Sequence, residues 1–152
     1  MNYKTFVVKI LLLLVLPLMG FVRDKCNYDK MYEELTKKLK KYTVLKDYRL
    51  YMKKNKSLDA GDYQYFTIPL NRGVKYKFVA LNSDDYDGKL IINLYNNPQK
   101  EFLFATTLTQ GTGVIRESLE FKCQSTGNFC IGCYFLDGVE GCAIAISAFQ
   151  QE

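Results

Sequence analysis

The chain has 152 residues, of which 24% are charged, a formal net charge of +5 and no histidine. Without histidine it cannot build a Ser-His-Asp or Cys-His catalytic site, nor a zinc or haem site with a histidine ligand. The charge is also too small for a nucleic-acid-binding protein, whose basic residues usually form a dense face.

Residues 1–20 have the pattern of an export signal. Lys4 and Lys9 form a short basic head, and an unbroken apolar run follows from Ile10 to Leu16. This run is short for a membrane span, and a charged segment follows at residues 23–25. We therefore predict a signal peptide over residues 1–20 and a secreted or periplasmic protein. The alternative is an uncleaved N-terminus that tethers the chain to a membrane.

After the signal, 132 residues with a net charge of +3 remain, enough chain for one domain with a single core. This part opens with an amphipathic helix, which we place within residues 21–46, with Asn27 as a suitable N-cap. Apolar side chains recur at spacings of three and four and share one helix face: Tyr28, Met31, Leu35, Leu39 and Tyr42. We expect this face to pack on the following domain. A coiled-coil or partner-binding helix and a membrane-surface helix are the alternatives.

From about residue 47 onward the apolar period changes from 3.6 to 2, which is typical of β-strands. Alternating runs separated by Gly, Asn, Asp and Pro turns occupy residues 66–70, 74–80, 90–94, 102–104, 119–123, 129–135 and 142–148. This pattern predicts an antiparallel β-sandwich, jelly-roll-like with seven to eight strands, over residues 47–152.

Two turns predict hairpins among the last strands. A type I′ turn at Asp137-Gly138 would place Cys133 directly opposite Cys142. A three-residue turn at residues 126–128 would pair the strands before and after it. Both registers keep the same side chains on the core face, whereas a slip of one residue would send them to solvent.

The five cysteines are candidates for disulfide bonds or thiol chemistry: Cys26, Cys123, Cys130, Cys133 and Cys142. The sequence leaves their pairing open. The hairpin register favours a Cys133–Cys142 bridge, and the alternative is that Cys26 fastens the helix to the sheet. Cys130 and Cys133 have the spacing of a redox motif, but residues three apart on a strand point to opposite faces. That arrangement favours structural bridges or buried thiols over a redox or zinc site.

Two further features are candidate binding positions. Asp84, Asp85 and Asp87 lie in an acidic turn that partly matches a calcium loop, although a leucine stands where the bidentate glutamate belongs. We expect a solvated turn there, with weak calcium binding as the alternative. Tyr63 and Tyr65 are out of phase with the apolar positions of their strand, so we predict an exposed aromatic pair suited to a surface contact or to stacking on a sugar.

The strand series from Tyr65 to Phe149 resembles the pre-peptidase C-terminal (PPC-type) jelly-roll domain, a small exported bacterial sandwich. The runs that carry this resemblance are residues 66–70, 74–78, 90–95 and 119–121, followed by residues 127–129. The helix-first layout and the Gly141-Cys142 last strand also resemble uncharacterised exported β-sandwich proteins of Gram-negative bacteria. The resemblance implies an accessory module without catalytic activity.

Together these patterns predict an exported, non-catalytic binding or structural module of the cell envelope, with a protein or glycan partner and no cofactor. Two alternatives stay open. One is a thiol redox or metal-binding protein that uses Cys130 and Cys133, and the other is a membrane-tethered subunit of an envelope complex.

Overall fold

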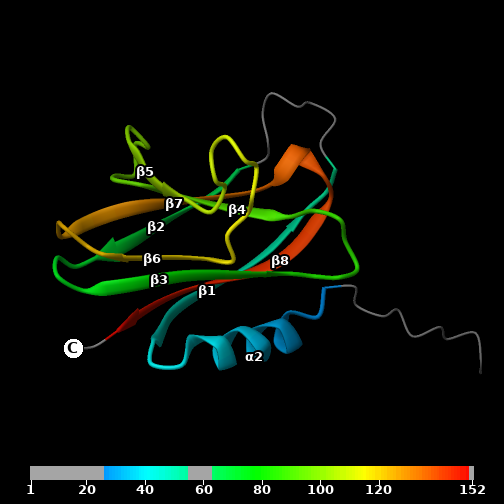
Figure 1. Ribbon diagram of the computed structural model, residues 1–152, viewed down its shortest axis with the longest axis horizontal. Helices are drawn as coiled ribbons and strands as arrows, with labels where there is room; N and C mark the ends of the chain where they lie inside the picture. The colour runs from blue at the N-terminus through cyan, green and yellow to red at the C-terminus, as the bar shows by residue number, and fades with distance from the viewer. Residues whose placement is uncertain (1–25, 55–62, 151–152) are drawn as a thin grey trace, which may run out of the picture.

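The computed structural model describes residues 26–54 and 63–150 (Figure 1). The predicted signal peptide over residues 1–20 lies outside these ranges. Within them, no helix combines the length and the apolar character that a membrane crossing requires.

In the described ranges, eight strands form two four-stranded antiparallel sheets. Sheet A has the order β1-β8-β3-β6, and sheet B has the order β2-β7-β4-β5. The strands are β1 (Thr43–Met52), β2 (Gln64–Leu70), β3 (Lys75–Asn82), β4 (Leu90–Tyr95), β5 (Leu103–Thr106), β6 (Ser118–Lys122), β7 (Gly127–Phe135) and β8 (Gly141–Gln150). The chain changes sheet at every connection except β4 to β5, which gives the strand order of a jelly roll. The predicted fold class is confirmed.

The core lies between the two sheets and is built by the alternating apolar side chains of the strands. Phe78 of β3 is 2% exposed and Ile131 of β7 is 1% exposed. Phe66 and Phe121 pack against this core from its margin. Each fully buried side chain of this kind contributes about 1.5–3 kcal/mol to folding, so alternation along the strands decides which faces meet.

Helix α2 (Tyr28–Leu39) covers the outer face of sheet A (Figure 1). Its apolar face and the outward side chains of β3 and β8 form a second buried cluster: Met31, Leu35, Leu39, Tyr42, Val79, Ile144, Ile146 and Ala148. Strand β8 is therefore buried on both faces, with Ala143 and Ala145 turned toward the core between the sheets. The predicted packing of the helix on the domain is confirmed.

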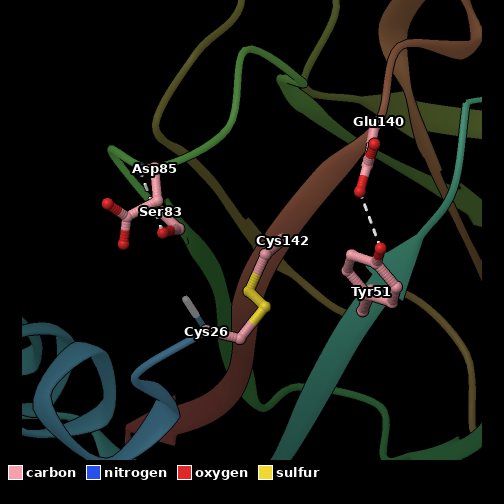
Figure 2. Close-up of a disulfide and its surroundings, with 6 residues drawn as sticks. All are labelled: Cys26, Tyr51, Ser83, Asp85, Glu140 and Cys142. Carbon is pink, nitrogen blue, oxygen red and sulfur yellow. Dashed lines mark hydrogen bonds between the residues drawn. A yellow bond between two sulfur atoms is a disulfide. The ribbon is translucent and has the colours of Figure 1, made fainter. Parts of the chain in front are cut away.

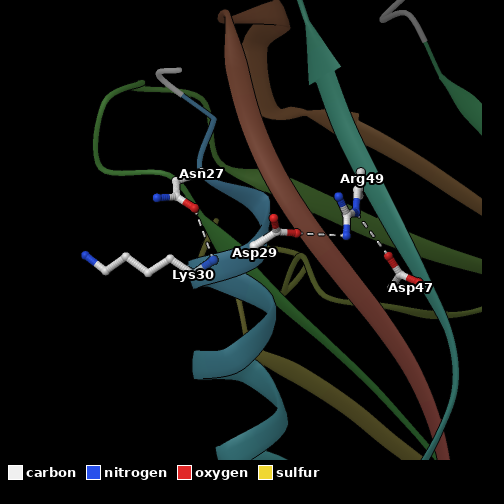
Figure 3. Close-up of polar contacts among 5 residues, drawn as sticks. All are labelled: Asn27, Asp29, Lys30, Asp47 and Arg49. Atoms are coloured by element: carbon white, nitrogen blue, oxygen red, sulfur yellow. Dashed lines mark hydrogen bonds and ion pairs between the residues drawn. The ribbon is translucent and has the colours of Figure 1, made fainter. Parts of the chain in front are cut away.

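Polar contacts fix the start of α2 against β1 (Figure 3). The Asn27 side chain accepts a hydrogen bond from the backbone nitrogen of Lys30 at 3.1 Å, so Asn27 is the N-cap, as predicted. The Arg49 guanidinium on β1 lies 3.1 Å from Asp29 Oδ1 and 3.4 Å from Asp47 Oδ2. Exposed ion pairs stabilise little, so these contacts mainly set the direction of the helix.

The first strand begins earlier than predicted. The helix ends at Leu39 and β1 begins at Thr43, so the predicted boundary between a helical segment at 21–46 and a sandwich at 47–152 falls inside β1. The signal for this strand is present in the sequence as alternation. Tyr48, Leu50 and Met52 stand at every second position, and the structure buries them while the residues between them are exposed.

Both predicted hairpins among the last strands are wrong, because the chain changes sheet at each of the two turns. Strand β6 pairs with β3 in sheet A, β7 pairs with β2 and β4 in sheet B, and β8 returns to sheet A between β1 and β3. Cys133 therefore lies opposite Gln64 and Ile92, and not opposite Cys142.

The turn between β7 and β8 nevertheless has the predicted local geometry. Asp137 and Gly138, in the short 3-10 turn η2 (Leu136–Gly138), have φ values of 56° and 61°, as a type I′ turn requires. Beyond the turn, the Phe135 ring occupies the space that a Cβ on Gly141 would fill. That close approach lets the chain cross to sheet A.

Candidate functional site

The outer face of sheet B carries a cluster of tyrosines, which we call the tyrosine face: Tyr63, Tyr65, Tyr95 and Tyr134. Tyr63 immediately precedes β2, Tyr65 lies at its start, Tyr95 ends β4, and Tyr134 lies near the end of β7. Tyr63 is 37% exposed and Tyr65 is 44% exposed. In Figure 1, α2 lies on the opposite side of the sandwich, and no described helix covers sheet B. The face therefore opens to solvent.

The four rings contact one another in a continuous series. The ring centroids are 4.5 Å apart for Tyr134 and Tyr63, 5.5 Å for Tyr63 and Tyr65, and 6.5 Å for Tyr65 and Tyr95. The Tyr63 and Tyr65 rings are nearly parallel, with an angle of 7° between their planes. Aromatic pairs at such distances contribute about 0.5–1.5 kcal/mol each beyond their burial. The rings thus hold one another in place.

Gly132 provides the space that two of these rings occupy. It lies opposite Tyr65 in the β2–β7 pairing, and a Cβ on it would sit 3.0 Å from Tyr65 Cε1 and 3.2 Å from Tyr95 Cε2. Its φ is not positive, so the position requires a small residue for space and not for backbone conformation. The glycine of the Cys130–Cys133 segment therefore serves the packing of the tyrosine face.

Two features determine the electrostatics of the tyrosine face: protonated tyrosine hydroxyls and the nearby ammonium of Lys100. Burial raises the pKa of Tyr63 and Tyr65, and it raises the pKa of Tyr134 to about 12. These three hydroxyls therefore stay protonated at physiological pH. The Lys100 ammonium lies 3.9 Å from the Tyr65 ring centroid, a cation–π contact.

The exposed Tyr63–Tyr65 pair predicted from the sequence is present, and its two rings stack on each other. Sequence reasoning missed Tyr95 and Tyr134. Both occupy the outward phase of their strands, next to the buried Leu94 and Phe135, so alternation alone marks them as outward. Only the strand order β2-β7-β4 shows that they join the pair.

The cysteines are arranged differently from the favoured prediction. Cys26, just before α2, forms a disulfide with Cys142 at the start of β8, with the Cα atoms 6.0 Å apart (Figure 2). The favoured Cys133–Cys142 pairing is wrong, and the structure shows the alternative, in which Cys26 fastens the helix to the sheet. The reason is that Cys133 points into the core from sheet B, whereas Cys142 points out of sheet A toward the helix.

Cys123, Cys130 and Cys133 are free and buried. Cys133 belongs to the core cluster, and Cys130 lies on the other face of β7, near Tyr65. Burial raises the pKa of Cys130, and it raises the pKa of Cys133 to about 12, so neither thiol is poised as a thiolate. Among the described residues, no group of three or more acidic or cysteine side chains could hold a metal ion. The arrangement does not support a redox or zinc site.

The acidic turn lies in the loop between β3 and β4, where Asp84, Asp85 and Asp87 are exposed. The Ser83 hydroxyl accepts a hydrogen bond from the Asp85 backbone nitrogen at 3.3 Å, and the two residues are drawn in Figure 2. Such side-chain bonds to nearby backbone stabilise a turn without any ion. Calcium binding at this turn stays a prediction.

Comparisons with known proteins were made by family, by curated sequence and by structure. No protein-family model and no curated protein matches the chain, so the resemblance to PPC-type domains stays a prediction. Among solved structures, the chain is similar to PliG of Aeromonas hydrophila, a periplasmic lysozyme inhibitor of g-type lysozyme. The two chains are 11% identical, with a TM-score of 0.47, over 72% of this chain and 86% of that chain.

Proposed function

We propose that this protein is an exported, non-catalytic module that binds another protein through the tyrosine face. The observation that carries the proposal is the series of four contacting rings, in which Tyr63 and Tyr65 are open to solvent. Tyrosine is enriched in protein interfaces because its ring offers a large contact area while only two side-chain torsions are immobilised. Rings that are already ordered lower the entropic cost of association further.

The ring arrangement favours a protein over a glycan as the partner. A sugar stacks on a flat, open aromatic face, but Tyr63 is engaged by both Tyr134 and Tyr65, and the ammonium of Lys100 lies over Tyr65. These neighbours leave little uninterrupted flat ring surface for a sugar, whereas the side chains of a protein can fit between and around the rings. The chain also has no tryptophan, the aromatic residue with the largest flat face.

Three observations support an exported and non-catalytic protein. The Cys26–Cys142 disulfide favours an oxidising compartment outside the cytoplasm, in keeping with an export signal over residues 1–20. The sequence has no histidine for acid–base or nucleophilic catalysis. The two thiols with the most suggestive spacing are buried and protonated. Binding is thus the activity that the described residues serve best.

The experiment compares the full chain with a Tyr63→Ser/Tyr65→Ser variant and with a Tyr51→Ser control. Tyr51 is a matched choice because it is 40% exposed and lies on β1 in the other sheet, where its hydroxyl donates to Glu140 at 2.6 Å (Figure 2). A protein captured by the wild-type chain from an extracytoplasmic extract of the source cells is identified and purified. Its affinity for each form is then measured by calorimetry.

We expect the double variant to bind the purified partner at least about tenfold more weakly, the loss typical of two central interface aromatics, and the Tyr51→Ser control to bind like the wild type. Circular dichroism and thermal melting confirm that all three forms are folded. Equal affinity of the wild type and the double variant would refute the proposal. The proposal would also fail if the ligand whose binding requires Tyr63 and Tyr65 were an oligosaccharide and not a protein.

A further inference from the structure

A lysine of the same chain lies over one ring of the tyrosine face. Lys100 is exposed in the loop between β4 and β5, and its ammonium lies 3.9 Å from the Tyr65 ring centroid. Among the described residues, no carboxylate lies within ion-pair distance of this ammonium. In the described part of the chain, the Lys100 charge is thus placed against an aromatic ring.

The loop backbone presents Lys100 to this ring. Lys100 has a φ of 62°, in the left-handed region that non-glycine residues rarely adopt. Its backbone nitrogen donates to the Asn97 carbonyl at 3.1 Å, and the Asn97 side-chain amide donates to Glu101 Oε2 at 2.7 Å. These bonds close the turn around Lys100 and occupy the neighbouring carboxylate. The turn thus fixes the backbone and leaves a flexible four-carbon stem to reach Tyr65.

The groups that remain when the Lys100 stem swings away favour a cation. Tyr65 and its neighbour Tyr63 are neutral phenols, and the ring face of a phenol carries negative potential. At the Tyr134 end of the series, burial and the neighbouring Tyr63 raise the pKa of the Tyr134 hydroxyl most, and the carboxylate of Asp137 adds a smaller rise. The negative potential of the ring faces, with a carboxylate near Tyr134, complements a positive charge.

We propose that the exposed ring of Tyr65 is a recognition position for an arginine or lysine side chain of the partner protein, and that Lys100 fills this position in the free protein. The inference rests on the proposed function of the tyrosine face. Binding then exchanges an internal cation for an external one. The Lys100 side chain moves into solvent, and the loop backbone need not rearrange because the ammonium at the end of a flexible side chain makes the contact.

The test uses N-acetyl-arginine amide as the probe and the uncharged N-acetyl-citrulline amide, which has nearly the same shape, as the matched control. Binding to the full chain is followed by NMR through the ring signals of the tyrosine face. Four forms are compared: wild type, Lys100→Ala, Lys100→Ala with Tyr65→Leu, and Lys37→Ala. Lys37 is an exposed lysine on the far side of the sandwich, on α2.

We expect Lys100→Ala to bind the arginine probe about two- to fivefold more tightly than the wild type, the range of an exposed cation–π contact. The citrulline probe should show no such gain, Lys37→Ala should behave like the wild type, and the added Tyr65→Leu change should abolish the gain. Equal binding of the two probes to Lys100→Ala, or a gain that survives Tyr65→Leu, would overturn the inference.

These results separate the inference from the proposed function. If the purified partner depends on Tyr63 and Tyr65 but the arginine probe shows no preference in Lys100→Ala, the tyrosine face binds a protein without a cation at Tyr65. If the partner ignores the tyrosine changes, the proposed function itself fails. In the complex, Lys100→Ala should also tighten partner binding by about the same two- to fivefold factor.

Discussion

Gly132 and Gly141 are both glycines because an aromatic ring lies where a side chain would begin, but the two rings differ in their freedom to move. The rings near Gly132 belong to Tyr65 and Tyr95 on the surface, and a Cβ there would require them to shift by a few tenths of an ångström. The ring against Gly141 belongs to Phe135, which is 3% exposed in the core. The same residue type therefore adjusts a surface in one place and permits the chain to change sheet in the other.

Replacing Gly141 by alanine should destabilise the protein, because the added methyl group enters the space of the Phe135 ring. Overpacking of this kind costs about 1–3 kcal/mol. Gly127→Ala is the matched control, since its added Cβ would meet nothing within 4 Å and its φ is not positive. Urea unfolding measures both variants. Equal stability of Gly141→Ala and Gly127→Ala would show that the Phe135 ring moves freely.

At the scale of the element, the apolar face of α2 and the second apolar face of β8 cover each other. Strand β8 carries apolar residues on both faces, which is expected only for a strand covered on both sides. One side is covered by sheet B and the other by the apolar face of α2. The residues of the helix face recur at helical spacing, so both partners of the contact are visible in the sequence. The sequence predicted that the helix packs on the domain, and only the strands that it covers had to come from the structure.

Leu35→Ala tests this contact. Leu35 is 1% exposed, and it packs in the cluster between α2 and sheet A. Truncation of a buried leucine costs about 2–5 kcal/mol, because the removed methyl groups leave a cavity. Lys37→Ala, on the solvent side of the same helix, should change the free energy of unfolding by less than about 0.5 kcal/mol. Denaturant unfolding followed by circular dichroism distinguishes them; a small effect of Leu35→Ala would mean that the helix is only loosely attached.

The elements were more predictable than their pairing. Alternation identified the core-facing side chains of β2, β3, β4, β6 and β7, and the type I′ geometry at Asp137 and Gly138 was predicted correctly. It failed for β8, where Ile144 and Ile146 face α2 and the core side is occupied by alanines. Alternation fixes the face of a strand, however, and not the sheet to which it belongs. That choice depends on contacts between distant residues, such as the hydrogen bond from the Ser147 hydroxyl to the Lys46 carbonyl, 101 residues apart. Both hairpin registers and the favoured disulfide failed for this reason.

The candidate site shows the same division. Tyr63 and Tyr65 stand two residues apart where β2 begins, so the sequence alone predicted an exposed pair. Tyr134 and Tyr95 reach the pair from β7 and β4, which lie far along the chain but beside β2 in sheet B. The contribution of Gly132 is likewise visible only when the rings over it are known. Local pattern thus located half of the tyrosine face, and topology supplied the rest.

At the scale of the whole molecule, the outer faces of the two sheets differ: one is covered by the helix and the other carries exposed tyrosines. The outer face of sheet A is closed by α2, whose N-terminal end is tied to β8 by the Cys26–Cys142 disulfide. The outer face of sheet B carries the exposed rings and Lys100. The helix and its disulfide, which stabilise the fold, thus lie on one side of the core. The surface that we propose for binding lies on the other side (Figure 1). A change on the helix side should alter stability and leave the tyrosine face intact.

The Cys26→Ala/Cys142→Ala variant tests this separation. The bond joins residues 116 positions apart, and a crosslink over so long a segment restricts the unfolded chain strongly. We expect the variant to lose about 2–5 kcal/mol of unfolding free energy. Added reductant should lower the unfolding midpoint of the wild type but not that of the variant, so each protein serves as the control for the other. Below the unfolding transition, the variant should bind the purified partner as the wild type does, because the rings on sheet B do not contact the disulfide. A folded variant with weakened partner binding would instead mean that the helix side and the tyrosine face are coupled through the core.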